Sequence, residues 1–296
     1  MLFSGYIVGY LFLAGTGSGA FSVAVCCCAL DALQKNRESE RVVMWSQIGF
    51  ILAPCFMIVA SLFLLLDLGN ASRIWQIMLS PFQSVMSVGA WLVALFTLVS
   101  GTLAIAGMVW REIPPAFMRV CCVLGIFFAF GVMSYTGLLL ADMVGVDFWR
   151  TPLLVVLFVV SSFTCGTQAL LLANGFLMSP SRAVPRALRN AASLFAFVEA
   201  CVLVAFLVTQ YGFSESAATS CEMLLVGSLS PVFWGGVCAI GLLVPCLCAI
   251  AFRILPVRIT TMIGAASALV GGLSLRYCII NAAVWAPLVL SSVVAL

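Results

Sequence analysis

Long apolar stretches alternate with short polar segments along almost the whole chain. Each stretch reaches the roughly 20 residues that an α-helix needs to cross about 30 Å of hydrocarbon. Charged residues, Pro or Gly bound them, as is typical of membrane helices. The pattern predicts eight membrane-spanning helices, over residues 4–33, 46–67, 82–110, 118–142, 151–178, 188–211, 228–252 and 257–281.

We therefore expect an all-α integral membrane protein, an eight-helix bundle in two four-helix halves that forms a single transmembrane domain over residues 1–296. The first stretch is too long for the apolar region of a signal peptide and lacks basic residues ahead of it, so it is interpreted as a retained span. The apolar tail 282–296 contains Pro287 and is too short for a turn and another crossing. It is expected to extend the last helix or to lie at the membrane interface.

The basic residues predict the orientation. Ten of the 13 Lys and Arg residues fall in alternate connections between spans, namely Lys35, Arg37, Arg41, Arg111, Arg119, Arg182, Arg186, Arg189, Arg253 and Arg258. Because basic loops stay in the cytoplasm, these connections are expected inside and both termini outside. The outer connections are acidic instead, with Asp67, Asp142, Asp147, Glu215 and Glu222 at or near them.

Composition excludes a water-soluble fold. Hydrophobic residues make up 64% of the chain and charged residues 8%, whereas soluble domains are about half apolar and about a quarter charged. The chain leaves no room for a separate catalytic domain, and a net charge of +3 is too small and scattered for a nucleic-acid surface. Lipid is therefore the expected solvent.

Cysteine and histidine restrict the possible cofactors. The 13 Cys residues lie mostly within apolar runs and form no Cys-x-x-Cys pair, so we interpret them as small packing residues and expect no metal and no iron–sulfur cluster in this chain. The chain has no His, which argues against a b-type haem. Proton chemistry is left to Asp, Glu, Tyr, Arg and water.

Ionisable residues inside a membrane are costly and suggest functional sites. At 1.5 Å per residue, Asp67, Tyr135, Asp142 and Arg276 are expected near the outer face, and Glu199 near mid-membrane. For Asp67 and Asp142, solvated positions at helix ends explain the charge as well as a functional role does. The corresponding alternative for Arg276 is a structural salt bridge with Asp67 or Asp142.

A glycine-rich stretch lies in the first predicted span. Gly15 and Gly19 in LAGTGSGAF are spaced as a small-xxx-small pair. Such a pair permits close approach of another helix or of a flat ligand, and helix packing is its commoner use.

Four segments in register resemble the NrfD/PsrC family, the membrane subunits of polysulfide-reductase-like molybdenum oxidoreductases. The segments are YLFLAGTGSGAF, SYTGLLL, DFWRTPLLVVLFVVSSFTCG and GGLSLRYCIINA. Their order and spacing agree with the family over nearly the whole chain. The related DmsC-type anchor subunits are the nearest competitor within this class.

The resemblance implies a quinone, expected to be menaquinone, bound near the outer face. It also implies two partner subunits, an iron–sulfur subunit of the four-cluster ferredoxin-like type and a molybdopterin catalytic subunit. Tyr135 resembles the tyrosine that contacts the quinone head, Gly15 and Gly19 the glycine patch of the pocket, and Arg276 the polar position of the last helix. This chain has no His to deliver protons to the quinone. Depth and charge nominate Asp67 near the head group, and Glu199 with Asp142 as a proton relay.

Two other functions stay open on the sequence alone. A secondary transporter or a proton-translocating protein would use Glu199 and Arg276 as membrane-embedded contacts, but no clear repeat relates the two halves of the sequence. A purely structural assembly subunit would not need a buried carboxylate.

Overall fold

The computed structural model describes residues 5–34, 39–68, 84–110, 113–143, 145–177, 186–251 and 256–285. Eight helical segments within these ranges are long and apolar enough to cross a membrane, which confirms the predicted all-α membrane fold. They are α1 (Gly5–Gln34), α2 (Ser39–Leu68), α4 (Val85–Val109), α5 (Pro115–Ala141), α6 (Pro152–Leu177), α7 (Arg186–Tyr211), η2 (Val232–Leu243) continued by α9 (Val244–Ala251), and α10 (Val257–Asn281).

Local capping signals explain where the helices begin and end. The Ser84 hydroxyl accepts the Ser87 N–H at 3.2 Å, so α4 begins at Val85 instead of residue 82. Pro115 occupies the first turn of α5, where its missing N–H costs nothing, and moves the start ahead of residue 118. The last helix ends at Asn281, and Ala282–Trp285 are not helical. The rest of the tail lies outside the described residues.

The seventh span is a wide π-helix followed by a short α-helix. Pro245 has no N–H for the Gly241 carbonyl, which an α-helix would require at this spacing. The backbone widens instead, and the Val244 N–H bonds the Ala239 carbonyl five residues back. Gly241 packs directly on Gly271 of α10, where a Cβ atom on either residue would clash with the other's backbone.

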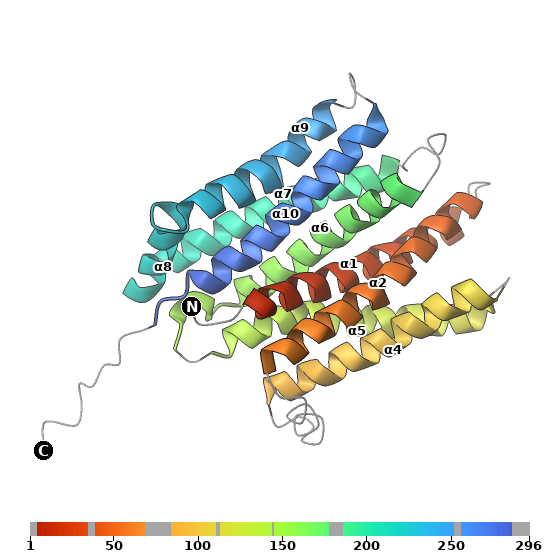
Figure 1. Ribbon diagram of the computed structural model, residues 1–296, viewed down its shortest axis with the longest axis horizontal. Coiled ribbons are helices and arrows are strands. Elements are labelled where there is room, and N and C mark those ends of the chain that lie inside the picture. The colour runs from red at the N-terminus through yellow and green to blue at the C-terminus, as the bar shows by residue number, and fades with distance from the viewer. Residues whose placement is uncertain are drawn as a thin grey trace, which may run out of the picture.

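The helices form two four-helix bundles that lie side by side (Figure 1). In the first bundle α1 packs on α2, α2 on α4, α4 on α5, and α5 on α1. In the second, α6 packs on α7 and α10, and the η2–α9 span packs on α10 and α7. Contacts of α6 with α1 and α5, and of α10 with α1, join the bundles. The predicted division into two four-helix halves therefore agrees with the packing.

The crossing of α1 and α6 uses the glycine-rich stretch. A Cβ atom at Gly19 would overlap the Ser162 carbonyl, and a Cβ at Gly166 would overlap the backbone of Gly19 and Ala20. The two helices therefore touch backbone to backbone. Close packing, one of the two uses predicted for this stretch, is the one that Gly19 has here.

One end of the bundle carries an extra helical cap. The pattern treated residues 212–227 as a loop, but α8 (Glu215–Leu225) is helical, with Ser214 as its N-cap. Next to it lies η1 (Asp147–Trp149), whose Asp147 Oδ2 accepts the Ser214 and Ser216 hydroxyls at 3.0 and 2.8 Å. An amphipathic helix of only 11 residues is too short to appear in a search for membrane spans.

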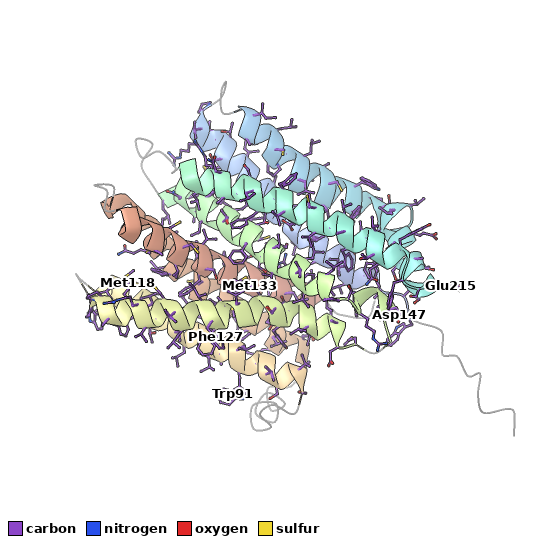
Figure 2. The ribbon with its side chains drawn as sticks, turned by 180° about the vertical axis from the view of Figure 1, so that it is seen from behind. Trp91, Met118, Phe127, Met133, Asp147 and Glu215 are labelled. Carbon is purple, nitrogen blue, oxygen red and sulfur yellow. The ribbon has the colours of Figure 1, made fainter. Side chains whose placement is uncertain are left out.

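The two ends of the molecule differ in charge. We call the end with η1 and α8 the acidic end, after Asp142, Asp147, Glu215 and Glu222, and the end where α5, α7 and α10 begin the basic end, after Arg119, Arg189 and Arg258. Figure 2 shows Met118 at the basic end and Asp147 and Glu215 at the other. The orientation of these ends in the membrane stays a prediction.

Candidate functional site

Two polar centres lie against α1 in the half of the molecule near the acidic end. The first lies in the first bundle and comprises Tyr10 of α1, Gly89 of α4 and Tyr135 of α5. We call it the tyrosine centre. The second surrounds Arg276 of α10, and we call it the arginine centre. Tyr10, Tyr135 and Arg276 each lie about 8 to 9 Å along their helix from its end.

Tyr10 is the unusual member of the tyrosine centre. Its side chain is 1% exposed, and its hydroxyl is buried without a hydrogen-bond partner among the described residues. A buried hydroxyl that makes no hydrogen bond typically costs 1–3 kcal/mol in proteins. Tyr135 lies within electrostatic range of it. The phenol is therefore placed to donate to an acceptor that the described chain does not supply.

Tyr135 is buried and its position depends on a glycine. A Cβ atom at Gly89 would overlap the Tyr135 ring, so α4 must have a residue without a side chain at this point. The absence of a side chain brings the Tyr135 ring directly onto the α4 backbone. The two tyrosines thus enter the first bundle from α1 and α5, at the same level of the membrane.

An apolar groove lies on the outer surface of α4 and α5, the two helices that supply Gly89 and Tyr135. It has a volume of about 480 Å³ and is lined by Leu92, Val123, Ile126, Phe127, Phe130, Gly131 and Ser134. Ser134 precedes Tyr135, and Leu92 lies one helical turn from Gly89. Phe127 is 69% exposed and points away from the bundle (Figure 2). The groove therefore opens toward the surrounding lipid.

Arg276 is fully buried and its guanidinium is extensively hydrogen-bonded. Its Nε donates to the Leu11 carbonyl at 3.2 Å, Nη1 donates to Ser161 Oγ and the Gly272 carbonyl at 3.1 Å, and Nη2 donates to Ser162 Oγ at 3.4 Å. All the acceptors that the structure describes for Arg276 are therefore uncharged. They do not include Asp67 or Asp142, the partners considered from the sequence.

Aromatic rings and a glycine complete the arginine centre. The guanidinium carbon lies 5.7 Å from the Phe12 ring centroid and 5.6 Å from that of Phe158, distances typical of cation–π contacts. A Cβ atom at Gly15 would lie 2.8 Å from Arg276 Nη2 and 2.6 Å from Ser162 Oγ. Gly15 therefore makes room for the arginine. The structure places it here and not beside Tyr135.

Glu199 is the buried carboxylate closest to this network. It lies midway along α7 and is 7% exposed. Its side chain lies within electrostatic range of Ser161, Thr164 and Arg276. Ser161 accepts from Arg276, so its own hydroxyl proton can turn toward Glu199. One serine thus lies between the guanidinium and the carboxylate.

The other two nominated carboxylates lie at the acidic end. Asp142 is exposed and caps the C-terminus of α5, and Asp67 is half-buried near the C-terminus of α2. Asp142 is at a helix end and Glu199 is about 18 Å along α7 from the acidic end, so the structure does not bring this predicted relay pair together. Their functional roles stay predictions.

The sequence analysis did not nominate Tyr10. Its signal was a phenol inside an apolar span, at the start of the motif YLFLAGTGSGAF. The rule that polar groups in a membrane suggest function was applied to charged residues and to Tyr135, and it applies to Tyr10 as well. What the sequence did not provide was the absence of a hydrogen-bond partner, which depends on tertiary contacts.

Comparison with known proteins identifies the family. The model of the family described as "Polysulphide reductase, NrfD" matches residues 1–287. The protein is also similar to the C subunit of polysulfide reductase from Wolinella succinogenes, with 28% identity over 301 residues, covering 93% of this chain and 92% of that protein. Both matches extend over nearly all of the sequence, as the four sequence motifs predicted. This multi-pass membrane protein therefore belongs to the NrfD family of polysulphide reductases.

Proposed function

We propose that this chain is the quinone-binding membrane subunit of a multi-subunit oxidoreductase and that the tyrosine centre holds the quinone head group. One observation supports the position of the site most strongly, the buried Tyr10 hydroxyl that lacks a partner among the described residues, beside Tyr135. A quinone carbonyl is an acceptor to which both phenols can donate. When bound, the quinone supplies the electron chemistry. A b-type haem is not expected to share this role, because the chain has no His to hold one.

The two tyrosines would bind and orient the head group. Each phenol donates one hydrogen bond, from α1 and from α5, so a ring between them is held from two helices. A donated hydrogen bond also stabilises negative charge that develops on a carbonyl oxygen during electron transfer, and this effect raises the rate as well as the affinity.

The groove between α4 and α5 fits the isoprenoid tail. It is apolar, opens toward lipid and is lined by Ser134, the residue before Tyr135 in α5. A ligand of this shape needs an apolar channel for its tail and a few polar groups for its head. The quinone would therefore reach the tyrosine centre sideways from the bilayer, without crossing the acidic end.

Quinone reduction takes up protons together with electrons, and Glu199 is the buried residue suited to hold one. Ser161 accepts from Arg276 and lies near Glu199, so the guanidinium is within electrostatic range of the carboxylate. Asp67 and Asp142, at the acidic end, would exchange protons with the aqueous surface. Arg276 would position Ser161 and the α1 backbone next to Tyr10 without binding the quinone itself.

The acidic end is the proposed docking surface for the electron-transfer partner. η1 and α8 form a rigid platform, in which the Trp149 indole N–H donates to the Ile279 carbonyl at 2.9 Å and Gln210 Nε2 to the Phe148 carbonyl at 2.8 Å. The tyrosine centre lies about 8 to 9 Å below this end. An iron–sulfur subunit of the four-cluster ferredoxin-like type, docked here and carrying a molybdopterin catalytic subunit, would be within electron-transfer range. Menaquinone is the proposed quinone.

This function is preferred to a secondary transporter. The family match is to polysulphide reductase, and the membrane-embedded arginine is bound by neutral groups of the chain itself. From the family we infer the cytoplasmic membrane of a bacterium or archaeon as the location. The distribution of basic residues favours both termini and the acidic end outside.

Quinone binding by purified protein tests the proposal. A short-tailed menaquinone analogue is titrated against the wild type and the Tyr10→Phe and Tyr135→Phe variants, with ligand-induced thermal stabilisation as the readout. Each substitution removes one hydroxyl and keeps the ring. A neutral hydrogen bond contributes about 0.5 to 1.5 kcal/mol, so the dissociation constant should rise about two- to ten-fold in each variant.

Tyr6→Phe and Tyr211→Phe are the matched controls. Both tyrosines are exposed at the acidic end of their helices, at 47% and 56%. Their variants should bind the analogue with wild-type affinity. Equal affinity in all four variants would remove the tyrosine centre from the quinone site.

A further inference from the structure

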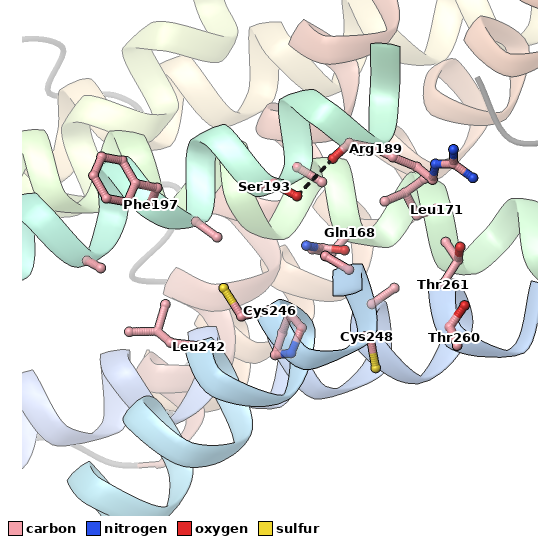
Figure 3. Close-up of a pocket in the computed structure, with 17 residues that line it drawn as sticks. Gln168, Leu171, Arg189, Ser193, Phe197, Leu242, Cys246, Cys248, Thr260 and Thr261 are labelled. Atoms are coloured by element: carbon pink, nitrogen blue, oxygen red, sulfur yellow. Dashed lines mark hydrogen bonds between the residues drawn. The ribbon is translucent and has the colours of Figure 1, made fainter. Parts of the chain in front are cut away.

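A pocket in the basic half of the second bundle has no part in the site described above. It has a volume of about 170 Å³ and lies among α6, α7, η2, α9 and α10 (Figure 3). We call it the basal pocket. Arg189 lines it near the basic end, where α7 begins. Most of its lining is apolar. The few polar side chains that line it indicate whether water or lipid occupies the pocket.

Gln168 is the polar residue that argues for water. Its side chain is 5% exposed, and its amide points into the basal pocket (Figure 3). A primary amide facing lipid tails would have no partner for its two donors and its acceptor, at a cost of several kcal/mol. Thr260 and Thr261 line the same space, and their hydroxyls, which donate to backbone carbonyls one turn back, can still accept from water. The volume is enough for several water molecules.

The basal pocket points toward Glu199. A small cavity with about 10 Å³ of space for water centres, the room of about one molecule, is lined by Glu199, Thr164, Gly241 and Leu242. Thr164 and Gln168 lie four residues apart on the same face of α6. The cavity and the basal pocket are therefore stacked along one helix face, and Leu242 lines both.

We propose that the basal pocket is a water-filled access route by which protons from the basic end reach Glu199, with Leu242 as the barrier between them. A hydronium ion in the pocket transfers its proton to the Glu199 carboxylate and leaves water behind, and the reverse step returns it. No electron moves and no other bond changes. Proton access to Glu199 does not depend on quinone binding. Only the further transfer of that proton to a quinone rests on the proposed function.

The surroundings of Glu199 suit a group that gains and loses a proton. From α6, Ser161, Thr164 and Cys165 lie within electrostatic range of its carboxylate. From α10, Arg276 acts across Ser161. From η2, apolar atoms of Gly241 and Leu242 close the cavity. The widened π-helix places this glycine against Gly271, which brings η2 close enough to form the barrier.

Native cysteines allow a direct test of water in the pocket. Cys246 and Cys248 line it (Figure 3), and thiolates react with charged methanethiosulfonate reagents only where water reaches them. The full chain in sealed membrane vesicles of both orientations is treated with the trimethylammonium-ethyl reagent and mapped by mass spectrometry. We expect labelling at Cys246 and Cys248 when the basic end faces the reagent, and none from the other side.

Two other cysteines are internal controls. Cys201 is exposed on α7 outside the basal pocket and should meet lipid, so the charged reagent should not label it. Cys221 lies in α8, where burial, with a contribution from the Glu222 carboxylate, raises its pKa to about 11 and keeps the thiol protonated at neutral pH. Labelling of Cys246 and Cys248 only by a lipid-soluble maleimide would show a pocket filled by acyl chains and overturn the proposal.

The barrier has its own matched pair of variants. Leu242→Ala opens the connection, whereas Leu243→Ala shortens a neighbouring leucine that is 56% exposed and outside both cavities. With a water-soluble carbodiimide added at the basic end, modification of Glu199 should rise several-fold in Leu242→Ala only. Equal modification in the two variants would overturn the role of Leu242. Because neither readout uses quinone, a failure here is separate from a failure of the tyrosine centre.

Discussion

The tyrosine centre and the arginine centre both lie against α1, yet their polar atoms are in contrasting states. Every guanidinium nitrogen of Arg276 donates to the chain itself, at 3.1 to 3.4 Å from oxygen acceptors. The Tyr10 hydroxyl, equally buried, has no partner among the described residues. The arginine centre is therefore complete without a ligand, and the tyrosine centre is not.

This contrast shows why charge alone is a poor guide to the ligand site in a membrane. Arg276 is the residue whose burial is most expensive, and its neighbours are arranged to satisfy it, which makes it a structural connection between α1, α6 and α10. A neutral phenol costs far less to bury unsatisfied, so the fold can tolerate a free donor until a ligand arrives.

The largest expected effect comes from breaking the arginine centre. Arg276→Met keeps an unbranched apolar stem but removes the guanidinium that donates to the Leu11 and Gly272 carbonyls and to two serine hydroxyls. A buried polar group left without its hydrogen-bond partner costs about 1 to 3 kcal/mol, and several such groups lose this donor together. Thermal denaturation in detergent should therefore show a large drop in Tm or a failure to fold.

Arg119→Met is the control for that variant, because Arg119 is exposed at the basic end and its hydrogen bond among the described residues, from Nε to the Pro115 carbonyl, stays within its own helix. Its Tm should stay near that of the wild type. An Arg276→Met protein as stable as Arg119→Met would contradict the structural role of the guanidinium.

The next effect concerns the helix crossing that holds the two centres together. Gly19→Val places carbon atoms where the Ser162 carbonyl lies, so α1 and α6 must separate. Overpacking of this kind costs about 1 to 3 kcal/mol. Gly101→Ala is the matched substitution, since a Cβ atom there meets nothing within 4 Å. It should stabilise α4 by up to about 1 kcal/mol through helix propensity. Equal changes in Tm for the two variants would contradict the close crossing.

The smallest effect has the opposite sign and sharpens the contrast between the centres. Tyr10→Phe removes a hydroxyl that has no partner among the described residues, so the ligand-free protein should become more stable, by about 1 kcal/mol. Denaturation of protein stripped of quinone measures this gain. A loss of stability would mean that the hydroxyl has a partner after all, which would weaken the argument for a ligand.

The sequence predicted the fold well and the site in part, for physical reasons. Membrane spans are recognised by length and apolarity, so all eight appeared, and α10 has the predicted bounds. The cap helix α8 was missed because its amphipathic pattern is short and outside the membrane. Such elements depend on tertiary partners. Asp147 of η1 is one of them, because its carboxylate accepts hydrogen bonds from Ser214 and Ser216 at the start of α8.

Within the site, the sequence identified residues but not their neighbours. Tyr135, Gly15, Arg276 and Glu199 were nominated by motif, depth and charge, and the structure assigns Tyr135 to one centre and the other three to the second. Which helix faces which cannot be read from a single apolar pattern, because a helix that is apolar all round has no marked face. The role of each residue toward quinone stays a prediction.

The central claim, that the quinone head lies at the tyrosine centre, is tested most directly by photolabelling. An azido-menaquinone analogue is crosslinked to the full chain in membranes, and the modified peptides are mapped by mass spectrometry, with excess unmodified quinone as competitor. The account predicts competable label in α1 near Tyr10, in α4 near Gly89 and in α5 near Tyr135. Competable label confined to α6, α7 and α10, around Arg276 and Glu199, would contradict it.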